Sequence, residues 1–257
     1  MDVYNNADSW SAYCHRCHES GRVMKVHQSV LRKVVEPNRI QPILATTMRF
    51  TEATQYEQNR IWTLLVQKGC PPGVIPEELL WYERSVNRLM IRQGNQALGR
   101  ALDSWRIPKW LAFGEWQGKP MLWQTRTPVR ETEPVPGVRQ GWAIAEDALS
   151  AYKIAKAIEV YWPQCRVGVM ATLGTSVTAA ALPYMAGTDV ACMYDGDLAG
   201  LNGFKAMRKR LNVFGGFTMD ARPTKGDPKN MTLEHIAERL EDVFGAKRLS
   251  GAVYSVD

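Results

Sequence analysis

The sequence of 257 residues is poor in cysteine and has no long apolar run. Its five cysteines are odd in number and few for this length, so a disulfide framework is not indicated and a reducing compartment is the default. No apolar stretch approaches the length of a membrane span, and the polar amino terminus differs from a signal peptide. We therefore expect a cytoplasmic protein with no membrane partner.

The overall composition is that of a soluble globular protein, with 45% hydrophobic and 23% charged residues. The length allows one large domain or two small ones. A formal net charge of +6 favours an anionic partner such as nucleic acid, although charge alone determines only solubility and electrostatic steering.

The first 28 residues contain a Cys14-x-x-Cys17 pair. Two thiolates at this spacing can bind one Zn²⁺ from a tight turn, but a structural zinc site needs four ligands. The alternatives are half of a zinc ribbon without its partner pair, or two surface thiols. Three histidines are candidates to complete a site: His15, His18 and His27.

Residues 29–135 are expected to form a smaller, basic α+β subdomain. A linker precedes a helix expected over 54–68. Short apolar runs then alternate with glycine and proline, which predicts antiparallel hairpins. These runs are 86–92, 97–103, 110–113 and 121–126.

Cations alternate with tryptophans across this basic subdomain. Positive charges next to aromatic rings suit phosphates and unstacked bases, which makes the segment a candidate template-binding surface. The alternative is that the tryptophans belong to the core and the cations to a solvated face. The residues concerned are Arg88, Arg92, Arg100, Lys109 and Arg126, with Trp105, Trp110, Trp116 and Trp123.

The proline-containing segment 127–140 is interpreted as a linker, and we place a domain boundary at residue 135. Strand-like and helix-like segments alternate beyond it, which predicts a mostly parallel sheet with helices on both faces. The expected strands are 141–145, 166–171, 190–194 and 217–221, and the expected helices are 147–161, 176–185, 204–211 and 232–244.

Acidic residues follow three of these four strands. Asp195 and Asp197 are spaced i, i+2, which places both side chains on one face of extended backbone. Because right-handed crossovers bring the strand ends to one edge, we expect the acids to lie together. The set is Glu146 after the first strand, Asp195 and Asp197 after the third, and Asp227 beside Lys225 after the fourth, with Gly174 and Thr175 after the second.

Carboxylate oxygens of this kind suit Mg²⁺ or Mn²⁺, which take one or two carboxylates and complete their shells with water and phosphate oxygens. Two such ions can align an attacking hydroxyl and stabilise a leaving pyrophosphate. A helix N-terminus at the same edge adds a phosphate site. The alternative is that all four acids are loop residues with no ligand.

The order of these motifs resembles the TOPRIM domain, which occurs in bacterial-type primases, type IA and type II topoisomerases and some nucleases. The resemblance covers residues 141–230. It rests on Glu146 after the first strand, LGT at 173–175 and DGDLAG at 195–200. It implies an α/β fold in which residues 136–257 form a Rossmann-like TOPRIM catalytic domain.

The flanking segments resemble primases of the bacteriophage primase–helicase class. YCHRCHESG at 13–21 is similar to the second half of the zinc ribbon that opens these proteins, and residues 69–111 are similar to the basic subdomain before their TOPRIM domain. The resemblance implies that Glu146, Asp195 and Asp197 are catalytic and metal-binding, with Asp227 as a further metal ligand. It also implies nucleotide or template contacts by Arg88, Arg100, Lys109, Lys225, Gly174 and Thr175.

The sequence departs from the family pattern in three places. Only the pair Cys14 and Cys17 is present where the zinc ribbon has two pairs, and Asp147 follows Glu146 directly where the family often has a glycine. A Walker A pattern is missing, so either the replicative helicase is a separate chain, which we expect, or the protein works without one.

The leading hypothesis is a DNA-dependent RNA primase, located in the host cytoplasm if the protein is phage-encoded. It would make short primers from NTPs on single-stranded DNA by two-metal nucleotidyl transfer. A TOPRIM nuclease would share the same acids but cut phosphodiesters. A third hypothesis is a template-binding accessory protein of the replisome without catalytic activity.

Overall fold

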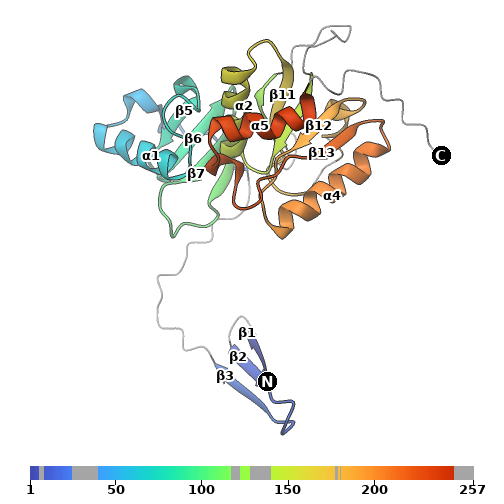
Figure 1. The fold of residues 1–257 in the computed structure, drawn as a ribbon. Coiled ribbons are helices and arrows are strands. Elements are labelled where there is room, and N and C mark those ends of the chain that lie inside the picture. Colours follow the sequence, from blue (N-terminus) through green and yellow to red (C-terminus); the bar gives the residue numbers. More distant parts are fainter. Residues whose placement is uncertain are drawn as a thin grey trace, which may run out of the picture.

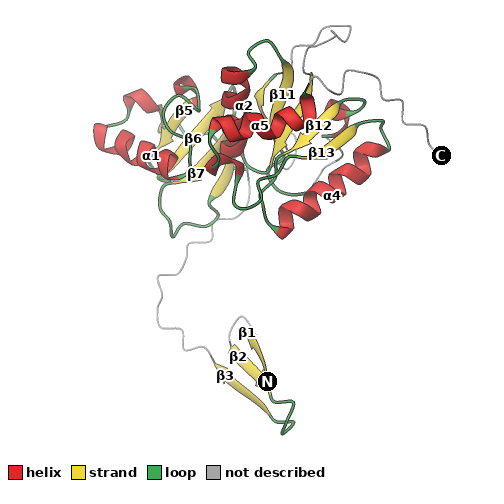
Figure 2. Ribbon diagram, viewed as in Figure 1, coloured by secondary structure: helices red, strands yellow, loops and turns green. Residues whose placement is uncertain are grey.

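The computed structural model describes residues 1–5, 9–24, 40–116, 122–127, 140–176, 179 and 181–245. Within these residues the chain forms a small three-stranded sheet and two five-stranded sheets (Figure 1). Helices lie against the two larger sheets only (Figure 2). We call residues 40–116 the antiparallel lobe, and residues 122–127 with 140–245 the parallel lobe.

The small sheet is formed by β1 (Asp2–Asn5), β2 (Ser9–Tyr13) and β3 (Ser20–Met24), all antiparallel. It stands apart from the two lobes in Figure 1. Residues 25–39, which include the candidate ligand His27, lie outside the described residues.

The antiparallel lobe has the strand order β4-β5-β6-β7-β8. Its helix α1 begins after Thr54, whose hydroxyl accepts from the amide of Glu57 while the Glu57 carboxylate accepts from the Thr54 amide. The helix predicted over 54–68 is thus confirmed. The elements are β4 (Thr47–Arg49), η1 (Phe50–Glu52), α1 (Gln55–Gln67), η2 (Glu77–Leu79), β5 (Leu80–Glu83), β6 (Arg88–Gln93), β7 (Gln96–Ala101) and β8 (Trp110–Gly114).

The parallel lobe has the strand order β13-β12-β10-β11-β9, in which all neighbours except β9 are parallel. Its elements are β9 (Trp123–Arg126), β10 (Gln140–Ala145), α2 (Ala148–Tyr161), β11 (Arg166–Ala171), α3 (Leu182–Met185), β12 (Asp189–Cys192), α4 (Leu198–Asn212), β13 (Phe217–Asp220), η3 (Pro228–Asn230) and α5 (Leu233–Phe244). The predicted alternation of strands and helices on a mostly parallel sheet is confirmed. No helix in the described ranges has the length and apolar content needed to cross a bilayer.

Three predictions about individual elements need correction. The run 121–126 does not form a hairpin in the antiparallel lobe, because β9 pairs with β11 of the other sheet. Of the helix predicted over 176–185, the structure assigns helix to Leu182–Met185, and residues 177, 178 and 180 lie outside the description. Helix α4 begins at Leu198, six residues before the predicted start at 204.

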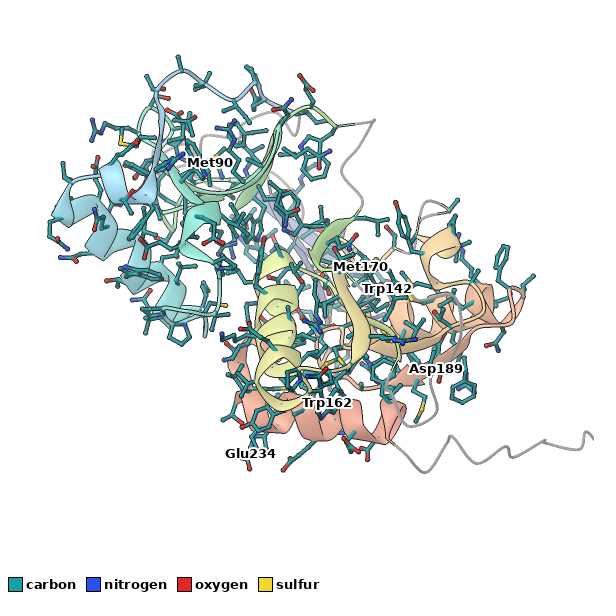
Figure 3. All side chains as sticks on the ribbon, turned by 90° about the horizontal axis from the view of Figure 1, so that it is seen from above. Met90, Trp142, Trp162, Met170, Asp189 and Glu234 are labelled. Carbon is teal, nitrogen blue, oxygen red and sulfur yellow. The ribbon has the colours of Figure 1, made fainter. Side chains whose placement is uncertain are left out.

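A single buried cluster runs through both lobes. It joins Ile61 and Leu89 of the antiparallel lobe to Ala143 and Ile154 of the parallel lobe. Helices α2 and α5 belong to this cluster, whereas α3 and α4 pack on the opposite face of the parallel sheet. Figure 3 shows the two lobes from above, with Met90 in one and Trp142 and Met170 in the other. The shared core fixes the position of one sheet relative to the other.

A tight contact between the lobes lies just after α1. Gly69 has a φ of +73°, and a Cβ at this position would collide with the backbone carbonyl oxygen of Lys229 in the parallel lobe. The next residue, Cys70, is buried and its thiol donates to the carbonyl of Leu149 in α2 at 3.6 Å. Glycine is therefore required at position 69 for two reasons: the backbone conformation and the close approach of the other lobe.

We expect Gly69→Ala to lower stability more than the matched substitution Gly73→Ala. Both glycines have positive φ, but a Cβ at Gly73 would meet nothing within 4 Å. Gly73→Ala should therefore cost only the backbone strain, about 1–2 kcal/mol, and Gly69→Ala roughly 1–3 kcal/mol more for the steric overlap. Denaturant unfolding of both variants measures this difference, and equal losses would contradict the interpretation of the contact.

Candidate active site

The four predicted carboxylates all follow parallel strands at the carboxyl edge of the sheet. Glu146 follows β10, Asp195 and Asp197 follow β12, and Asp227 lies beyond β13 next to η3. They are close enough to affect one another's ionisation: the charges of Asp227 and Glu146 act on Asp195, and the charge of Asp197 acts on Glu146. The structure thus brings the predicted acids together.

The turn that carries Asp195 and Asp197 depends on two glycines. The amide of Gly196 donates to the carbonyl of Gly226 at 2.7 Å. A Cβ at Gly200 would collide with the carbonyl oxygen of Asp195, so the first turn of α4 can press against the strand end only without a side chain there. Asp197 is the N-cap of α4, and its Oδ1 accepts from the amide of Gly200 at 2.7 Å.

Asp195 lies in a strongly anionic environment. Burial, followed by the charges of Asp227 and Glu146, raises its pKa to about 7. Its Oδ1 is buried and has no hydrogen-bond partner. Burial and the charges of Asp197 and Asp147 likewise raise the pKa of Glu146. Both shifts mean that negative charge on these carboxylates is disfavoured in the metal-free protein and would be favoured by a bound cation.

The turn after β11 brings Gly174 beside Glu146. The nucleotide contacts predicted for Gly174 and Thr175 stay predictions. The amide of Gly174 donates to the carbonyl of Glu146 at 3.0 Å. The hydroxyl of Thr172 donates to the carbonyl of Gly174 at 2.6 Å. Leu173 has a φ of +54°, which is unusual for a branched side chain, and it lines a cavity between the two lobes.

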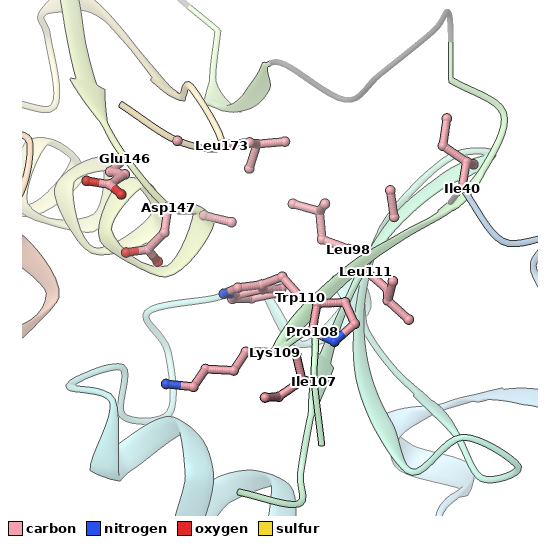
Figure 4. A pocket seen from close by; sticks show the side chains of 13 residues that line it. Ile40, Leu98, Ile107, Pro108, Lys109, Trp110, Leu111, Glu146, Asp147 and Leu173 are labelled. Carbon is pink, nitrogen blue, oxygen red and sulfur yellow. The ribbon is translucent and has the colours of Figure 1, made fainter. Parts of the chain in front are cut away.

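A cavity of about 860 Å³ separates this edge from the antiparallel lobe. Figure 4 shows Glu146 and Asp147 on one wall and Pro108, Lys109 and Trp110 on the other. The remaining lining is mostly apolar. Such a cavity has the size and chemistry of a small-molecule site, with a few polar groups among apolar walls.

Arg100 and Lys109, which the sequence predicts to contact phosphates, lie near or on this wall. Lys109 is exposed and lines the cavity. The guanidinium of Arg100 lies 5.4 Å from the ring centroid of Trp110. Burial lowers the pKa of Arg100, while the charge of Asp147 across the cavity raises it. Their phosphate contacts stay predictions.

Arg88 does not fit its predicted role. Its side chain is fully buried. Its guanidinium donates to the carbonyls of Pro108 at 2.9 Å, Gly99 at 3.2 Å and Lys109 at 3.3 Å. The prediction that Arg88 contacts a phosphate is therefore wrong. Its Nη1 and Nη2 groups hold the segment that carries Lys109 and Trp110.

The tryptophans and cations of the antiparallel lobe and β9 divide between the two interpretations. Trp123 is core, with 1% of its surface exposed, and it stacks on Trp116. Trp105 is half exposed and carries Arg106 against its ring. Arg92 stacks on Trp81, with 4.6 Å between guanidinium carbon and ring centroid.

Two basic residues lie on the loop after β13. Lys225 is exposed there, and its predicted phosphate contact stays a prediction. Arg222, which sequence reasoning missed, donates to both carboxylate oxygens of Asp220 at 2.9 Å and to the carbonyl of Asp197 at 3.3 Å. It ties the end of β13 to the turn that carries the acids.

Sequence reasoning also missed the pairing of Asp147 with Lys229. Asp147 is the N-cap of α2, with Oδ1 accepting from the amides of Leu149 at 2.9 Å and Ser150 at 3.2 Å. Its Oδ2 accepts from Lys229 Nζ at 2.9 Å, and the same ammonium contacts Asp227. The only available signal was the lysine two residues after Asp227.

The Cys14–Cys17 turn joins β2 to β3. The Cys14 amide donates to the carbonyl of Glu19, and backbone hydrogen bonds from Cys17 and Arg16 lower the pKa of the Cys14 thiol. The neighbouring imidazoles have other partners: His15 contacts Asp2 at 2.8 Å, and His18 contacts the Tyr13 hydroxyl at 3.0 Å. Zinc binding by the two thiols of this turn, with His15 or His18 as further ligands, stays a prediction.

The donor set at the sheet edge fits a hard divalent ion. Among the described residues, no three carboxylate, imidazole or thiol side chains are grouped so that they could hold an ion by themselves. Mg²⁺ usually takes one or two protein carboxylates and fills the rest of its shell with water and phosphate. The buried, unpartnered Oδ1 of Asp195 is an oxygen that such an ion would satisfy.

No protein-family model and no curated protein matches the sequence. Among solved structures, the fold is similar to the zinc-binding and RNA polymerase domains of the primase from Aquifex aeolicus, with a TM-score of 0.44 and 15% identity. The similarity covers 63% of this chain and 42% of that chain. Our functional proposal therefore rests on the motifs and the geometry of the site.

We expect Asp195→Asn to stabilise the metal-free protein at pH 8. The pKa of Asp195 is about 7 in the folded state, above its value of ~3.9 in an unfolded chain. The folded state therefore binds this proton more tightly, and wild-type stability should fall as the pH rises from about 4 to about 7. After allowance for partial exposure, the gain in the variant is on the order of 1–2 kcal/mol.

Thermal unfolding in a chelator, repeated from pH 4 to pH 8, measures this effect. Asp242→Asn on the exposed face of α5 is the matched control and should change little. A gain for Asp195→Asn that does not depend on pH, or a loss of stability at pH 8, would contradict the assignment.

Proposed function

We propose that the protein is a DNA-dependent RNA primase that makes short RNA primers on single-stranded DNA. The observation that carries the proposal is the cavity between the lobes, with Glu146 on one wall and Lys109 and Trp110 on the other. It places Glu146 and Asp147 of the TOPRIM-like sheet opposite the basic segment that resembles primases. An apolar wall, an aromatic ring and cations opposite carboxylates suit a nucleoside triphosphate with its metal.

Primer extension forms a bond from the 3′-hydroxyl oxygen of the RNA to the α-phosphorus of an incoming NTP and releases pyrophosphate. In our proposal Glu146, Asp195 and Asp197 hold Mg²⁺ or Mn²⁺, which supplies positive charge to the phosphates when bound. Glu146, whose pKa is raised, is suited to accept the proton of the attacking hydroxyl. Lys109 and Arg100 bind phosphate, and Trp110 offers a surface for the base.

Several further features belong to the same proposal. The Cys14–Cys17 turn would supply two of four ligands to a Zn²⁺ ion. The basic antiparallel lobe would contact the template, and a replicative helicase would act as a separate partner in the cytoplasm. Binding that depends on phosphate contacts should weaken steeply with salt.

A metal-dependent nuclease is the second candidate, because the same acids could serve phosphodiester cleavage. The cavity wall formed by residues 107–112 favours the primase, since a nuclease does not need a site for a free nucleotide. Cleavage of single-stranded DNA without NTPs would support the nuclease. DNA binding without either reaction would support an accessory protein.

Primer synthesis from labelled NTPs on single-stranded DNA with Mg²⁺ or Mn²⁺ tests the proposal directly. We expect Asp195→Asn and Asp197→Asn each to reduce product by at least ~100-fold, because charge stabilisation at the phosphates is lost. Asparagine at position 197 keeps an oxygen to cap α4. Asp242→Asn should retain activity, and equal activity in all four proteins would refute the proposed site.

Lys109→Ala should mainly weaken nucleotide binding. A lost hydrogen bond to a charged phosphate costs about 1.5–3 kcal/mol, so we expect KM for NTP to rise by roughly tenfold or more, with a smaller change in kcat. Lys209→Ala removes an exposed charge near the far end of α4 and serves as the control. An unchanged KM in Lys109→Ala would exclude the proposed position of the triphosphate.

A further inference from the structure

The acidic edge of the parallel sheet already contains one cation, the ammonium of Lys229. Its Nζ lies 2.9 Å from Asp147 Oδ2 and contacts Asp227 Oδ2 as well. Only 12% of the Lys229 side chain is exposed. Among the neighbouring charges, it is the positive group that acts on both Asp195 and Glu146.

The backbone of Lys229 is held from two sides, which fixes the point from which its side chain extends. Its carbonyl oxygen accepts from Nζ of Lys153 at 2.7 Å, and that lysine is 8% exposed. Gly69 of the antiparallel lobe presses on the same carbonyl. Within η3, the amide of Asn230 donates to the carbonyl of Asp227 at 2.9 Å. The ammonium is therefore placed by the scaffold and is not a mobile surface charge.

Asp147 and Asp227 are both engaged by this ammonium. The other oxygen of Asp147, Oδ1, accepts hydrogen bonds from amides at the N-terminus of α2, so few of its lone pairs remain for another cation. A metal ion that used Asp227 Oδ2 would have to displace Lys229 and leave a largely buried ammonium without that partner, which is costly. Asp195, by contrast, has a buried Oδ1 with no partner.

The geometry points to Lys229 as a built-in counter-charge that takes the place of a second divalent ion. The site would then bind a single ion, with Asp195 as a ligand, where the sequence motifs alone predict two ions. This inference rests on the proposed metal site and specifies how many divalent ions it binds per chain. Lys229 acts here as a positioning residue: it holds Asp227 and Asp147 without touching the substrate.

Titration with Mn²⁺, followed by the electron paramagnetic resonance signal of the free ion, counts the ions bound per chain. We expect one ion for the wild-type protein and one for Lys229→Arg, which keeps the charge. Lys229→Gln keeps hydrogen-bonding capacity for both carboxylates but removes the charge, and it should bind a second ion. The double variant Lys229→Gln/Asp227→Asn should return to one ion, because the released carboxylate is gone.

Two single variants test the inference without altering Lys229. Asp227→Asn in the wild-type background should change Mn²⁺ affinity by less than about threefold, because Asp227 is paired with Lys229 and is not a ligand of the single ion. Asp195→Asn should lower it by more than about tenfold. Far-UV circular dichroism shows whether each variant is folded. If Lys229→Gln does not fold, Asp227→Asn and Asp195→Asn still decide the question.

The outcomes separate the inference from the proposed function. One ion for both the wild type and a folded Lys229→Gln would refute the counter-charge and leave the metal site in place. Two ions on the wild type, with one lost in Asp227→Asn, would also refute it. No specific Mn²⁺ binding by the wild-type protein would overturn the metal site and the inference together.

Discussion

Mutual repulsion among carboxylates at one sheet edge is the constraint on which the site depends. Glu146, Asp195, Asp197 and Asp227 meet there, and burial makes their charges harder to tolerate. The chain offsets this cost with groups from separate elements. Asp197 accepts a hydrogen bond at the N-terminus of α4, and Asp227 forms an ion pair with Lys229. Asp195 lacks such compensation for one of its oxygens, which makes this point the natural place for an ion.

The shared core turns two sheets into the walls of one cavity. Buried residues of α1 and β6 continue without interruption into those of α2 and β10, so the wall with Trp110 and the wall with Glu146 belong to one packed unit. Arg88 contributes from inside the antiparallel lobe by holding the backbone of Pro108 and Lys109. The geometry of the cavity is thus set by packing and backbone hydrogen bonds behind the surface that a ligand would meet.

Local patterns in the sequence were sufficient for the parallel sheet and for the convergence of the acids. The strand over 166–171 coincides with β11, and strand ends in a parallel sheet must share an edge. The start of α4 was misplaced because LAGLNG resembles a loop, whereas Gly200 and Gly203 are needed for close approach to Asp195 and Tyr194. The role of Arg88 and the pairing of Lys229 with Asp147 depend on tertiary contacts, which no local pattern encodes. The domain boundary predicted at residue 135 stays a prediction, although β9 already belongs to the second sheet.

The contact of Gly69 with the carbonyl of Lys229 has a consequence for how the protein tolerates sequence change. Gly69 does not line the cavity, yet its backbone approaches the carbonyl of Lys229, the residue whose ammonium lies among the acids. Under selection for activity, position 69 should behave like a residue of the site and accept few alternatives. A comparable turn glycine such as Gly73, which faces open space, should drift more freely. Substitution patterns at position 69 would then reflect the placement of the Lys229 ammonium among the acids as well as local folding.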